Sequence, residues 1–469
     1  MCGIGGIINI NNSKIDPEIA NNIKTSLEHR GPDNSSIKHI SETVSLVHTR
    51  LAIIDIEDRS NQPFHSDDNR YWIVFNGEIY NYKEIREELE NKGYSFHTSG
   101  DTEVLLKGFI CYKEKILDKL RGQFAFAIYD SIEKTTFLAR DRIGIKPLYF
   151  SKYKEWIVFG SEMKTIESSK LIPFIPDTES YMTYMRHLCI PGSSTGNKNI
   201  SKVRPGEYVT FSKSGEIKTY KYWDPFSFEI DYEMGESEAS DELERLLIES
   251  VEYRKVSDVE VGLFLSGGLD SSLIGKLMKV GSQSKLKGFN IDYEEHFDGY
   301  KGEVSEAEYA SSNIDIELIK EKIAYRDFKT LLNNYSNYQD DLNGDEVGIP
   351  LYFLGKSARS KGITVVQVGE GADELFYGYE HWLRYLKLNK FIKPIMKNNS
   401  RVSGFSNHRL NLLSNIIFNR TSFAGGALGF NLSEINRLVE GGISENPSSL
   451  HYVDSKWNDY FSRPDAELS

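Results

Sequence analysis

The chain has 469 residues, which is too long for one ordinary hydrophobic core and predicts two or three domains. Its 39% hydrophobic and 27% charged residues are typical of a soluble globular protein, and no run of about 18 apolar residues indicates a membrane span. The net charge of −13 argues against a surface that coats nucleic acid, although a local anion site is compatible with it.

The three cysteines are widely spaced and include no Cys-x-x-Cys pair, so neither a disulfide framework nor a zinc site is predicted. The N-terminus also lacks the basic start and apolar stretch of a signal peptide. A reducing cytoplasm is therefore the expected location. Cys111 and Cys189 are expected to be small buried hydrophobic residues, whereas the position of Cys2 suggests chemistry.

The first part of the chain predicts an α+β domain, in which sheets are covered by helices. Helices are expected after Asp16-Pro17, around Ile85 and Leu89, and over 102–109. Short runs of strand-forming residues predict strands over 3–10, 43–54, 71–75, 123–129, 136–139, 156–159 and 208–211.

A change of composition predicts a domain boundary. Residues 191–215 are rich in Gly, Ser, Pro and Asn, and a polar stretch follows over 231–240. We therefore expect one domain over 2–215, a linker over 216–238 and a second domain over 239–469.

The second domain predicts an α/β fold with a doubly wound parallel sheet, because strands alternate with helices. Strands are expected over 261–265, 288–291 and 364–368, and helices around Leu243 to Val251 and over 273–278 and 350–360. Ligands of such sheets bind at the carboxyl ends of the strands.

Cys2 is a candidate nucleophile. A Met followed by a small residue is readily removed, and removal would leave Cys2 with a free α-amine whose pKa is about 8. That amine can take the thiol proton, directly or through a water, without a separate histidine. The neighbouring Gly3, Gly5 and Gly6 let backbone and substrate approach closely.

Five further motifs follow this N-terminus in a fixed order. They are His29-Arg30-Gly31-Pro32-Asp33, Arg50–Asp55, Phe75–Asn81, Ser99–Glu103 and Leu138–Tyr149. Together they resemble the glutaminase domain of class II amidotransferases, the N-terminal nucleophile (Ntn) type, over nearly the whole first domain. The resemblance implies stacked antiparallel sheets flanked by helices and the release of ammonia from glutamine.

The same resemblance assigns roles within a glutamine pocket. Asn76 and Gly77 would supply N–H donors to the oxyanion that forms when the thiolate attacks the amide. Arg50 suits the α-carboxylate of glutamine, and Glu78 and Asp101 suit its ammonium group. The remaining expected glutamine-binding residues are Leu51, Ala52, Ile53 and Ile54.

Each of these residues also has a structural alternative. Arg50 alone would be read as a surface ion pair, and Asn76-Gly77 as a type I′ hairpin turn. His29 and Arg30 are expected to support the pocket wall. The segment Arg140–Arg142 is expected to form structural ion pairs.

An anion-binding loop is predicted at Ser266–Ser272, which connects an apolar strand to a helix. The loop lacks the Gly-Lys-Ser/Thr of a Walker motif and resembles the pyrophosphate loop of ATP pyrophosphatases. Asp270 in this loop and Asp373 in the acidic segment 369–379 are predicted Mg²⁺ ligands that would bridge pyrophosphate oxygens. The alternative for the acidic segment is a solvated loop.

The second half as a whole resembles asparagine synthetase and its relatives, including β-lactam synthetase-like enzymes. This resemblance implies that ATP adenylates a carboxylate, aspartate foremost, which ammonia from the first domain then converts to an amide. It makes Glu370 a base or essential carboxylate of that step. The expected ATP-binding residues are Leu265, Ser266, Gly267, Gly268, Asp270, Ser271, Ile291, Val368 and Gly369. The expected partners are small-molecule substrates and a second copy in a homodimer, with no nucleic acid and no membrane.

Two departures from the family keep alternatives open. The Ala-Arg-Val-Pro-Phe-like motif of the family is not found, and 463–469 reads like the start of that segment, so a C-terminally incomplete chain is expected. Gln339–Asp345 replaces an Asp-Glu-Pro-type stretch. The acceptor could therefore be a sugar acid or a biosynthetic intermediate, or the second half could bind nucleotide without turnover. The lysines at 387, 390, 393 and 397 are expected to form a solvated helix face.

Overall fold

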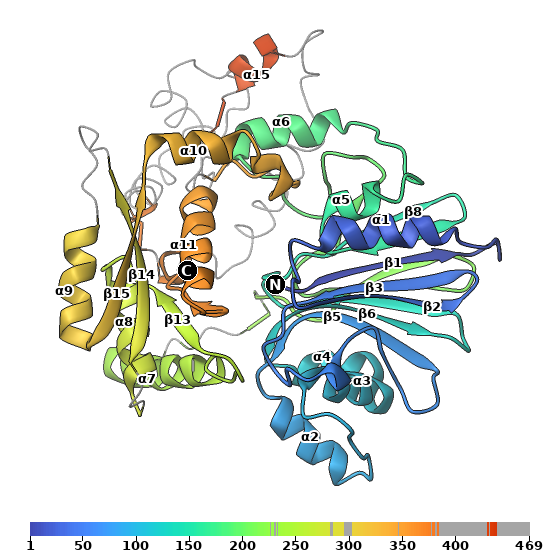
Figure 1. Ribbon diagram of the computed structural model, residues 1–469, viewed down its shortest axis with the longest axis horizontal. Coiled ribbons are helices and arrows are strands. Elements are labelled where there is room, and N and C mark those ends of the chain that lie inside the picture. Colours follow the sequence, from blue (N-terminus) through green and yellow to red (C-terminus); the bar gives the residue numbers. More distant parts are fainter. Residues whose placement is uncertain are drawn as a thin grey trace. The chain divides into compact units, whose positions relative to one another are not determined.

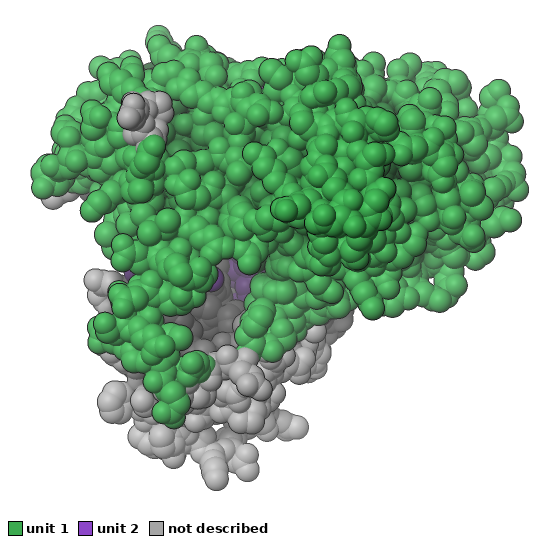
Figure 2. All heavy atoms as spheres, turned by 90° about the horizontal axis from the view of Figure 1, so that it is seen from below, with its two compact units in different colours: residues 1–174, 199–335, 349–368 green, residues 175–198, 336–348, 369–469 purple. Residues whose placement is uncertain are grey.

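The computed structural model describes residues 1–225, 227–228, 231, 233–281, 285–294, 303–345, 347–376, 378–379, 382–383, 429–430 and 432–438. The predictions for the lysine run 387–397, for Tyr377 in the acidic segment and for 463–469 lie outside the described residues. Spatial contacts divide the chain into two compact units (Figure 2). Unit 1 comprises residues 1–174, 199–335 and 349–368, and unit 2 comprises 175–198, 336–348 and 369–469.

Two antiparallel sheets stack on each other in the N-terminal part of unit 1 (Figure 1). The first has the order β10 (Ser201–Lys202), β8 (Tyr149–Tyr153), β9 (Trp156–Gly160), β1 (Gly3–Asn9), β3 (Val44–Arg50) and β2 (Asn34–Ser41). The second has the order β12 (Ile217–Lys221), β11 (Glu207–Phe211), β7 (Thr135–Arg140), β6 (Gly122–Asp130), β5 (Tyr71–Ile79) and β4 (Phe64–His65).

Helices cover the outer face of each sheet, which gives four layers and three cores. The first sheet is covered by α1 (Pro17–Leu27) and α5 (Met163–Glu167). The second is covered by α2 (Tyr82–Glu90), α3 (Asp101–Tyr112) and α4 (Ile116–Lys119). Short 3₁₀ turns are η1 (Asp58–Ser60), η2 (Lys113–Lys115) and η3 (Tyr335–Asn337). The predicted α+β domain with stacked, helix-flanked sheets is confirmed.

Helix α1 illustrates how the sequence specifies these layers. Asp16 accepts a hydrogen bond from the amide of Glu18 at 2.9 Å, and Pro17 occupies the first turn, where its missing N–H costs nothing. Ala20, Ile23 and Leu27 recur at helical spacing and are buried against the first sheet.

A parallel sheet forms the C-terminal part of unit 1. Its order is β15 (Ile316–Ile323), β14 (Leu286–Tyr293), β13 (Val261–Phe264) and β16 (Val365–Gln367). One face packs against α7 (Glu236–Tyr253), α8 (Leu269–Lys279) and α9 (Val304–Ile314), and the other against α11 (Gly348–Ser360). Helix α10 (Tyr325–Leu332) follows β15. Because helices cover both faces, the predicted doubly wound fold is confirmed.

The strand order places a topological switch point between β13 and β16. These strands pair in parallel, with Leu263 opposite Gln367, while the chain runs from β13 outward to β14 and β15. Open α/β sheets bind ligands outside the carboxyl ends of strands at such a point. The predicted loop Ser266–Ser272 begins there.

Unit 2 contains α6 (Thr178–His187), α12 (Ala372–Phe376) and α15 (Leu432–Leu438). Its 339–345 stretch is tied to the end of α6, because Cys189 forms a β-bridge with Asn343 and the amide of Gly344 donates to the carbonyl of Leu188 at 2.7 Å. Cys189 is exposed, so the prediction that it is a buried hydrophobic residue is wrong.

Strand β12 lies within the stretch expected to be a linker. All five of its residues are exposed, and it pairs along its length with β11, so the second sheet continues past residue 215. An exposed edge strand has no alternation of buried and exposed residues, which explains why the sequence pattern missed it. Strand β2 was missed because its eight residues are largely polar. In the described part of the chain, no helix is long and apolar enough to cross a membrane.

Candidate active site

A pocket of about 270 Å³ in unit 1 gathers most of the predicted glutamine-binding residues. They come from separate segments, namely the N-terminus, β3 with the loop after it, β5 and the start of α3. The predicted residues in the lining are Cys2, Arg50, Leu51, Ile53, Ile54, Asn76, Gly77, Glu78 and Asp101. Ala52 is not in this lining, and its amide donates instead to Asp33 at 2.9 Å.

Cys2 is held at the pocket by its neighbours. Its Sγ lies 3.4 Å from the amide nitrogen of Leu51, and its carbonyl accepts a hydrogen bond from the Nε of Arg30 at 2.9 Å. Arg30 is buried and forms an ion pair with Glu162 at 2.6 Å. His29 lies 3.0 Å from the same carboxylate. Both residues therefore support the pocket wall, and Glu162, which carried no prediction, anchors them.

Burial shapes the acid–base behaviour at this end of the pocket. Burial raises the pKa of the Cys2 thiol, while the Leu51 amide, the α-amine and Lys146 act in the opposite direction. Burial also lowers the pKa of the Met1 α-amine to about 5. With that pKa the Met1 amine is neutral at pH 7 and a weak base.

Asn76 and Gly77 lie inside β5, paired with Ala125 and Phe124 of β6, so the alternative of a hairpin turn is wrong. Asn76 is buried, and its Nδ2 has no hydrogen-bond partner within the described residues. A buried donor without a partner costs about 1–3 kcal/mol, so a ligand that accepts a hydrogen bond from Nδ2 would recover part of that cost. A Cβ at Gly77 would lie 2.2 Å from the carbonyl oxygen of Gln123, so only glycine fits.

Phe75, the residue before Asn76, is held through both its amide and its carbonyl group. The side chain of Gln62 accepts from the amide of Phe75 at 2.7 Å and donates to its carbonyl at 3.3 Å. His48 also contacts that carbonyl at 3.2 Å, and burial lowers the pKa of His48 to about 3. Neutral, buried partners therefore hold the strand that carries Asn76.

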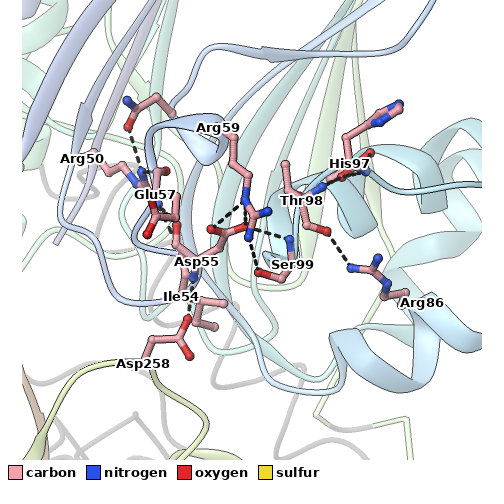
Figure 3. A network of polar contacts seen from close by, with 12 residues as sticks. Arg50, Ile54, Asp55, Glu57, Arg59, Arg86, His97, Thr98, Ser99 and Asp258 are labelled. Carbon is pink, nitrogen blue, oxygen red and sulfur yellow. Dashed lines mark hydrogen bonds and ion pairs between the residues drawn. The ribbon is translucent and has the colours of Figure 1, made fainter.

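Arg50 is buried and holds the loop that follows β3, so the alternative of a surface ion pair is wrong (Figure 3). One terminal nitrogen donates to the carbonyl of Glu57 at 2.9 Å and to Asn61 Oδ1 at 2.8 Å. The other donates to the carbonyls of Ile54 and Asp55. Arg50 also lines the pocket, and its role in carboxylate binding stays a prediction.

Two carboxyl groups share the pocket with one lysine. Burial raises the pKa of Asp101 to about 7, and the charge of Glu78 adds to this shift. A hydrogen bond from the amide of Ile79 at 3.0 Å acts in the opposite direction and lowers the pKa. Burial also raises the pKa of Glu78, and Lys146 opposes that shift. An ammonium group between these acids would favour their charged forms.

Lys146 is a pocket residue to which the sequence assigned no role. Hydrogen bonds hold its loop, because Asp141 accepts from the amides of Ile145 and Lys146 at 2.9 and 3.0 Å, and Arg140 donates to the Lys146 carbonyl at 2.8 Å. Arg142 donates to the carbonyl of Leu120 at 2.6 Å. These contacts of Arg140, Asp141 and Arg142 run to backbone groups, so the residues have the structural role that was predicted for them.

The predicted nucleotide loop is locally ordered. Gly267 has φ +88°, and a Cβ there would lie 2.3 Å from the backbone of Glu306, so only glycine fits. Ser266 Oγ accepts from the amide of Gly268 at 3.2 Å and lies 3.0 Å from Ser271 Oγ. The first turn of α8, which carries Asp270, follows directly and presents its amides at this loop.

The other predicted nucleotide residues occupy different places. Leu265 is buried, and its carbonyl accepts from Asn290 at 2.8 Å, beside Ile291 on β14. Val368 ends unit 1, while Gly369, Glu370 and Asp373 belong to unit 2. Among the described residues, no three or more His, Cys, Asp or Glu side chains cluster in a way that could hold a metal ion.

Glu370 lies among other acids of unit 2. Burial raises its pKa, and the charges of Glu374, Asp345 and Asp373 add to the shift. Asp345 comes from the 339–345 stretch that departs from the family pattern. The stretch thus contributes to the electrostatics around Glu370.

Comparisons with known proteins agree with the assignment of glutaminase motifs to the first part of the chain and synthetase motifs to the second. Residues 1–223 match the family described as glutamine amidotransferase domain, and 242–433 match asparagine synthase. Asparagine synthetase [glutamine-hydrolyzing] 1 of Bacillus subtilis is 39% identical over 394 residues, which are 83% of this chain and 61% of that protein. A putative asparagine synthetase [glutamine-hydrolyzing] 2 of Methanocaldococcus jannaschii is 34% identical, over 85% of this chain and 79% of that protein.

Among solved structures, the glutamine phosphoribosylpyrophosphate amidotransferase from B. subtilis matches with a TM-score of 0.36 and 19% identity. This match covers 68% of this chain and 65% of that one. The chain spans less than two thirds of the length of the B. subtilis asparagine synthetase that it matches.

Proposed function

Because the chain belongs to the family of glutamine-hydrolysing asparagine synthetases, we propose that it releases ammonia from glutamine at Cys2 and uses ATP to join this ammonia to a carboxylate. The observation that carries the first half is that Cys2 and Asn76, whose Nδ2 has no partner among the described residues, line one pocket. A nucleophile and a free buried donor in the same pocket are two of the parts that acyl transfer from an amide requires.

In this mechanism Met1 is first removed and the α-amine of Cys2 takes the thiol proton. The thiolate attacks the side-chain amide carbon of glutamine. The oxyanion that forms accepts hydrogen bonds from the side-chain amide of Asn76 and the backbone amide of Gly77. The amine then returns its proton to the leaving nitrogen, which departs as ammonia. Water hydrolyses the thioester to glutamate and restores the thiol. A single donor to such an oxyanion contributes about 3–4 kcal/mol to transition-state stabilisation.

Recognition of glutamine follows from the charges in the pocket. Arg50 would bind the α-carboxylate, and Glu78 and Asp101 would bind the ammonium group. The raised pKa values of the two acids support this assignment, since their charged forms lack a sufficient positive partner until the ammonium arrives. Leu51, Ile53 and Ile54 would enclose the aliphatic part.

For the second half we propose adenylation of aspartate, with release of pyrophosphate and then AMP. The loop Ser266–Ser271 and the α8 N-terminus offer hydroxyl and amide donors for phosphate. Asp270 and Asp373 are our candidates for Mg²⁺, which prefers one or two carboxylates plus phosphate oxygens. Bound Mg²⁺ would supply charge neutralisation, and Glu370 would act as the essential carboxylate. The donor set of the loop, all oxygen and amide groups, fits this chemistry.

Pyrophosphate release tests the proposal. With glutamine, ATP and Mg²⁺, we expect release to depend on aspartate and to match the asparagine formed. A sugar acid or another carboxylate that replaces aspartate would correct the acceptor and retain the reaction. Nucleotide binding with no AMP from any acceptor would reject the synthetase half.

We also propose that the protein works in the reducing cytoplasm, because its three cysteines are free thiols and Cys2 must stay reduced to attack. Association into a homodimer is a further prediction. Its measurement is the mass of the protein in solution by light scattering.

A further inference from the structure

Asp258 contacts the wall of the glutamine pocket from a distant part of the sequence. Its Oδ2 accepts a hydrogen bond from the amide of Asp55 at 2.8 Å, 203 residues away. Its own amide donates to the carbonyl of Ile53 at 2.9 Å. Figure 3 shows Asp258 beneath Ile54 and Asp55. Two hydrogen bonds thus bracket Ile54, which lines the pocket.

Asp55 joins the two sides of the pocket. Its carboxylate accepts from the amide of Ser99 at 2.7 Å and pairs with Arg59 at 3.1 Å. Ser99 directly precedes Gly100 and Asp101, which line the opposite wall. Asp55 therefore connects the wall that contains Ile54 to the wall that contains Asp101.

The backbone of Asp55 requires this support. Its φ is +43°, in the left-handed region that non-glycine residues adopt at a cost. Strained residues persist only where surrounding contacts determine them. Here Arg50 donates to the Asp55 carbonyl on one side, and Asp258 accepts from its amide on the other.

Other contacts between these parts of unit 1 are of a different kind. Arg121 pairs with Glu249, and Arg359 with Asp33 at 3.4 Å, both between exposed or half-buried side chains. Such pairs contribute little, typically 0–1 kcal/mol. Asp258 instead bonds the backbone of a pocket wall, and it lies three residues before β13, the strand that leads into the nucleotide loop.

We propose that Asp258 is a positioning residue for glutamine binding. It fixes the backbone of Ile53–Asp55, and through Asp55 it sets the separation of the Arg50 and Asp101 sides of the pocket. This inference rests on the proposed glutaminase function for its kinetic consequence. The two hydrogen bonds that join Asp258 to Ile53 and Asp55, here called the clamp, can be measured without glutamine.

The test compares Asp258→Ala with Asp258→Asn in the full chain. Alanine removes the acceptor, whereas asparagine keeps an acceptor oxygen and removes only the charge. We expect Asp258→Ala to raise KM for glutamine about fivefold with kcat nearly unchanged, and Asp258→Asn to stay within about twofold of the wild type. Glu260→Ala is the matched control, because Glu260 is a nearby acid that pairs with Lys287 and not with the loop.

Hydrogen exchange of the peptide 51–61 supplies the second readout. It should become faster in Asp258→Ala and unchanged in Glu260→Ala, at equal thermal midpoints. Unchanged exchange, or an unchanged KM despite faster exchange, would overturn the proposal. A wild type without glutaminase activity would reject the proposed function instead, while the exchange result would still decide whether the clamp exists.

Discussion

The glutamine pocket and the nucleotide loop are built in opposite ways. The pocket combines segments that are far apart in sequence, and buried groups such as Arg30, Arg50 and Gln62 hold each segment by bonds to backbone oxygens and amides. The loop Ser266–Ser271 is continuous and is held by its own serines. A site built from one segment depends on local geometry, whereas the pocket depends on tertiary contacts that no single motif contains.

The two regions also differ in where their reactive groups lie. The pocket contains a thiol, an amine, two acids and a lysine within one unit. The loop presents neutral donors and Asp270, while Glu370 and Asp373 belong to the other unit. Substitutions should therefore separate the two activities, and the following predictions run from the largest expected effect to the smallest.

Cys2→Ala should reduce glutamate release from glutamine by more than about a thousandfold, because no other group in the proposed mechanism can form the thioester. Synthesis from added ammonia should remain near the wild-type rate. Glutamate and product are measured in parallel with each nitrogen source. Loss of the ammonia-dependent reaction in this variant would contradict two separate sites.

Asn76→Ala should lower kcat for glutamine hydrolysis by about 10²–10³-fold with little change in KM, since the donor acts on the oxyanion and not on the substrate. The substitution removes no hydrogen bond of Nδ2, which has no partner among the described residues, so the thermal midpoint should not fall for that reason. A higher KM at unchanged kcat would show that Asn76 binds glutamine instead.

Asp270→Asn should reduce pyrophosphate release by about a hundredfold with either glutamine or ammonia, and leave glutamate release intact. The control is Asp315→Asn, at a residue that pairs with Lys279 at the far end of α8. Equal losses in both variants would indicate damage to the fold and not to a Mg²⁺ site.

The pH dependence gives the smallest effect. Burial raises the pKa of Asp101 from 3.8 to about 7, so the group is neutral below that pH and charged above it. If the charged form binds the ammonium, KM for glutamine should rise roughly fivefold to tenfold between pH 7.5 and 6. Asp101→Asn should have a high KM at both pH values. A wild-type KM independent of pH would remove Asp101 from ammonium recognition.

The same shift has a consequence for stability with a definite sign. The folded state holds the Asp101 proton more tightly than the unfolded state, so the free energy of unfolding contributed by this group falls as pH rises from about 4 to about 7. Asp101→Asn should remove that part of the pH dependence, as measured by urea unfolding across this range.

The sequence predicted the elements whose side chains carry a strong pattern. Helix α1 has a capping Asp16 and apolar residues at helical spacing, and strand β13 is apolar and ends in a glycine-rich loop. It missed exposed or polar strands such as β12, because their stability comes from pairing with a neighbour and not from a buried face.

Within the site, the sequence predicted reactive groups better than supporting ones. Cys2, Asn76 and Asp101 stand in recognisable motifs, and the structure brings them to one pocket. Gln62 and Asp258 have no motif, since each acts by one or two bonds to a backbone far away in sequence. Lys146 stands within the Leu138–Tyr149 motif, but its place in the pocket depends on the loop that Asp141 holds.

Covalent labelling of Cys2 tests the central claim most directly. The protein is incubated with a diazoketone analogue of glutamine, and the adduct is located by intact mass and peptide mapping. We predict one adduct per chain, on a peptide that begins at Cys2 after loss of Met1, and protection by excess glutamine. Adducts on Cys111 or Cys189, or continued glutamate release by Cys2→Ala without any adduct in the wild type, would contradict the assignment of Cys2 as the nucleophile.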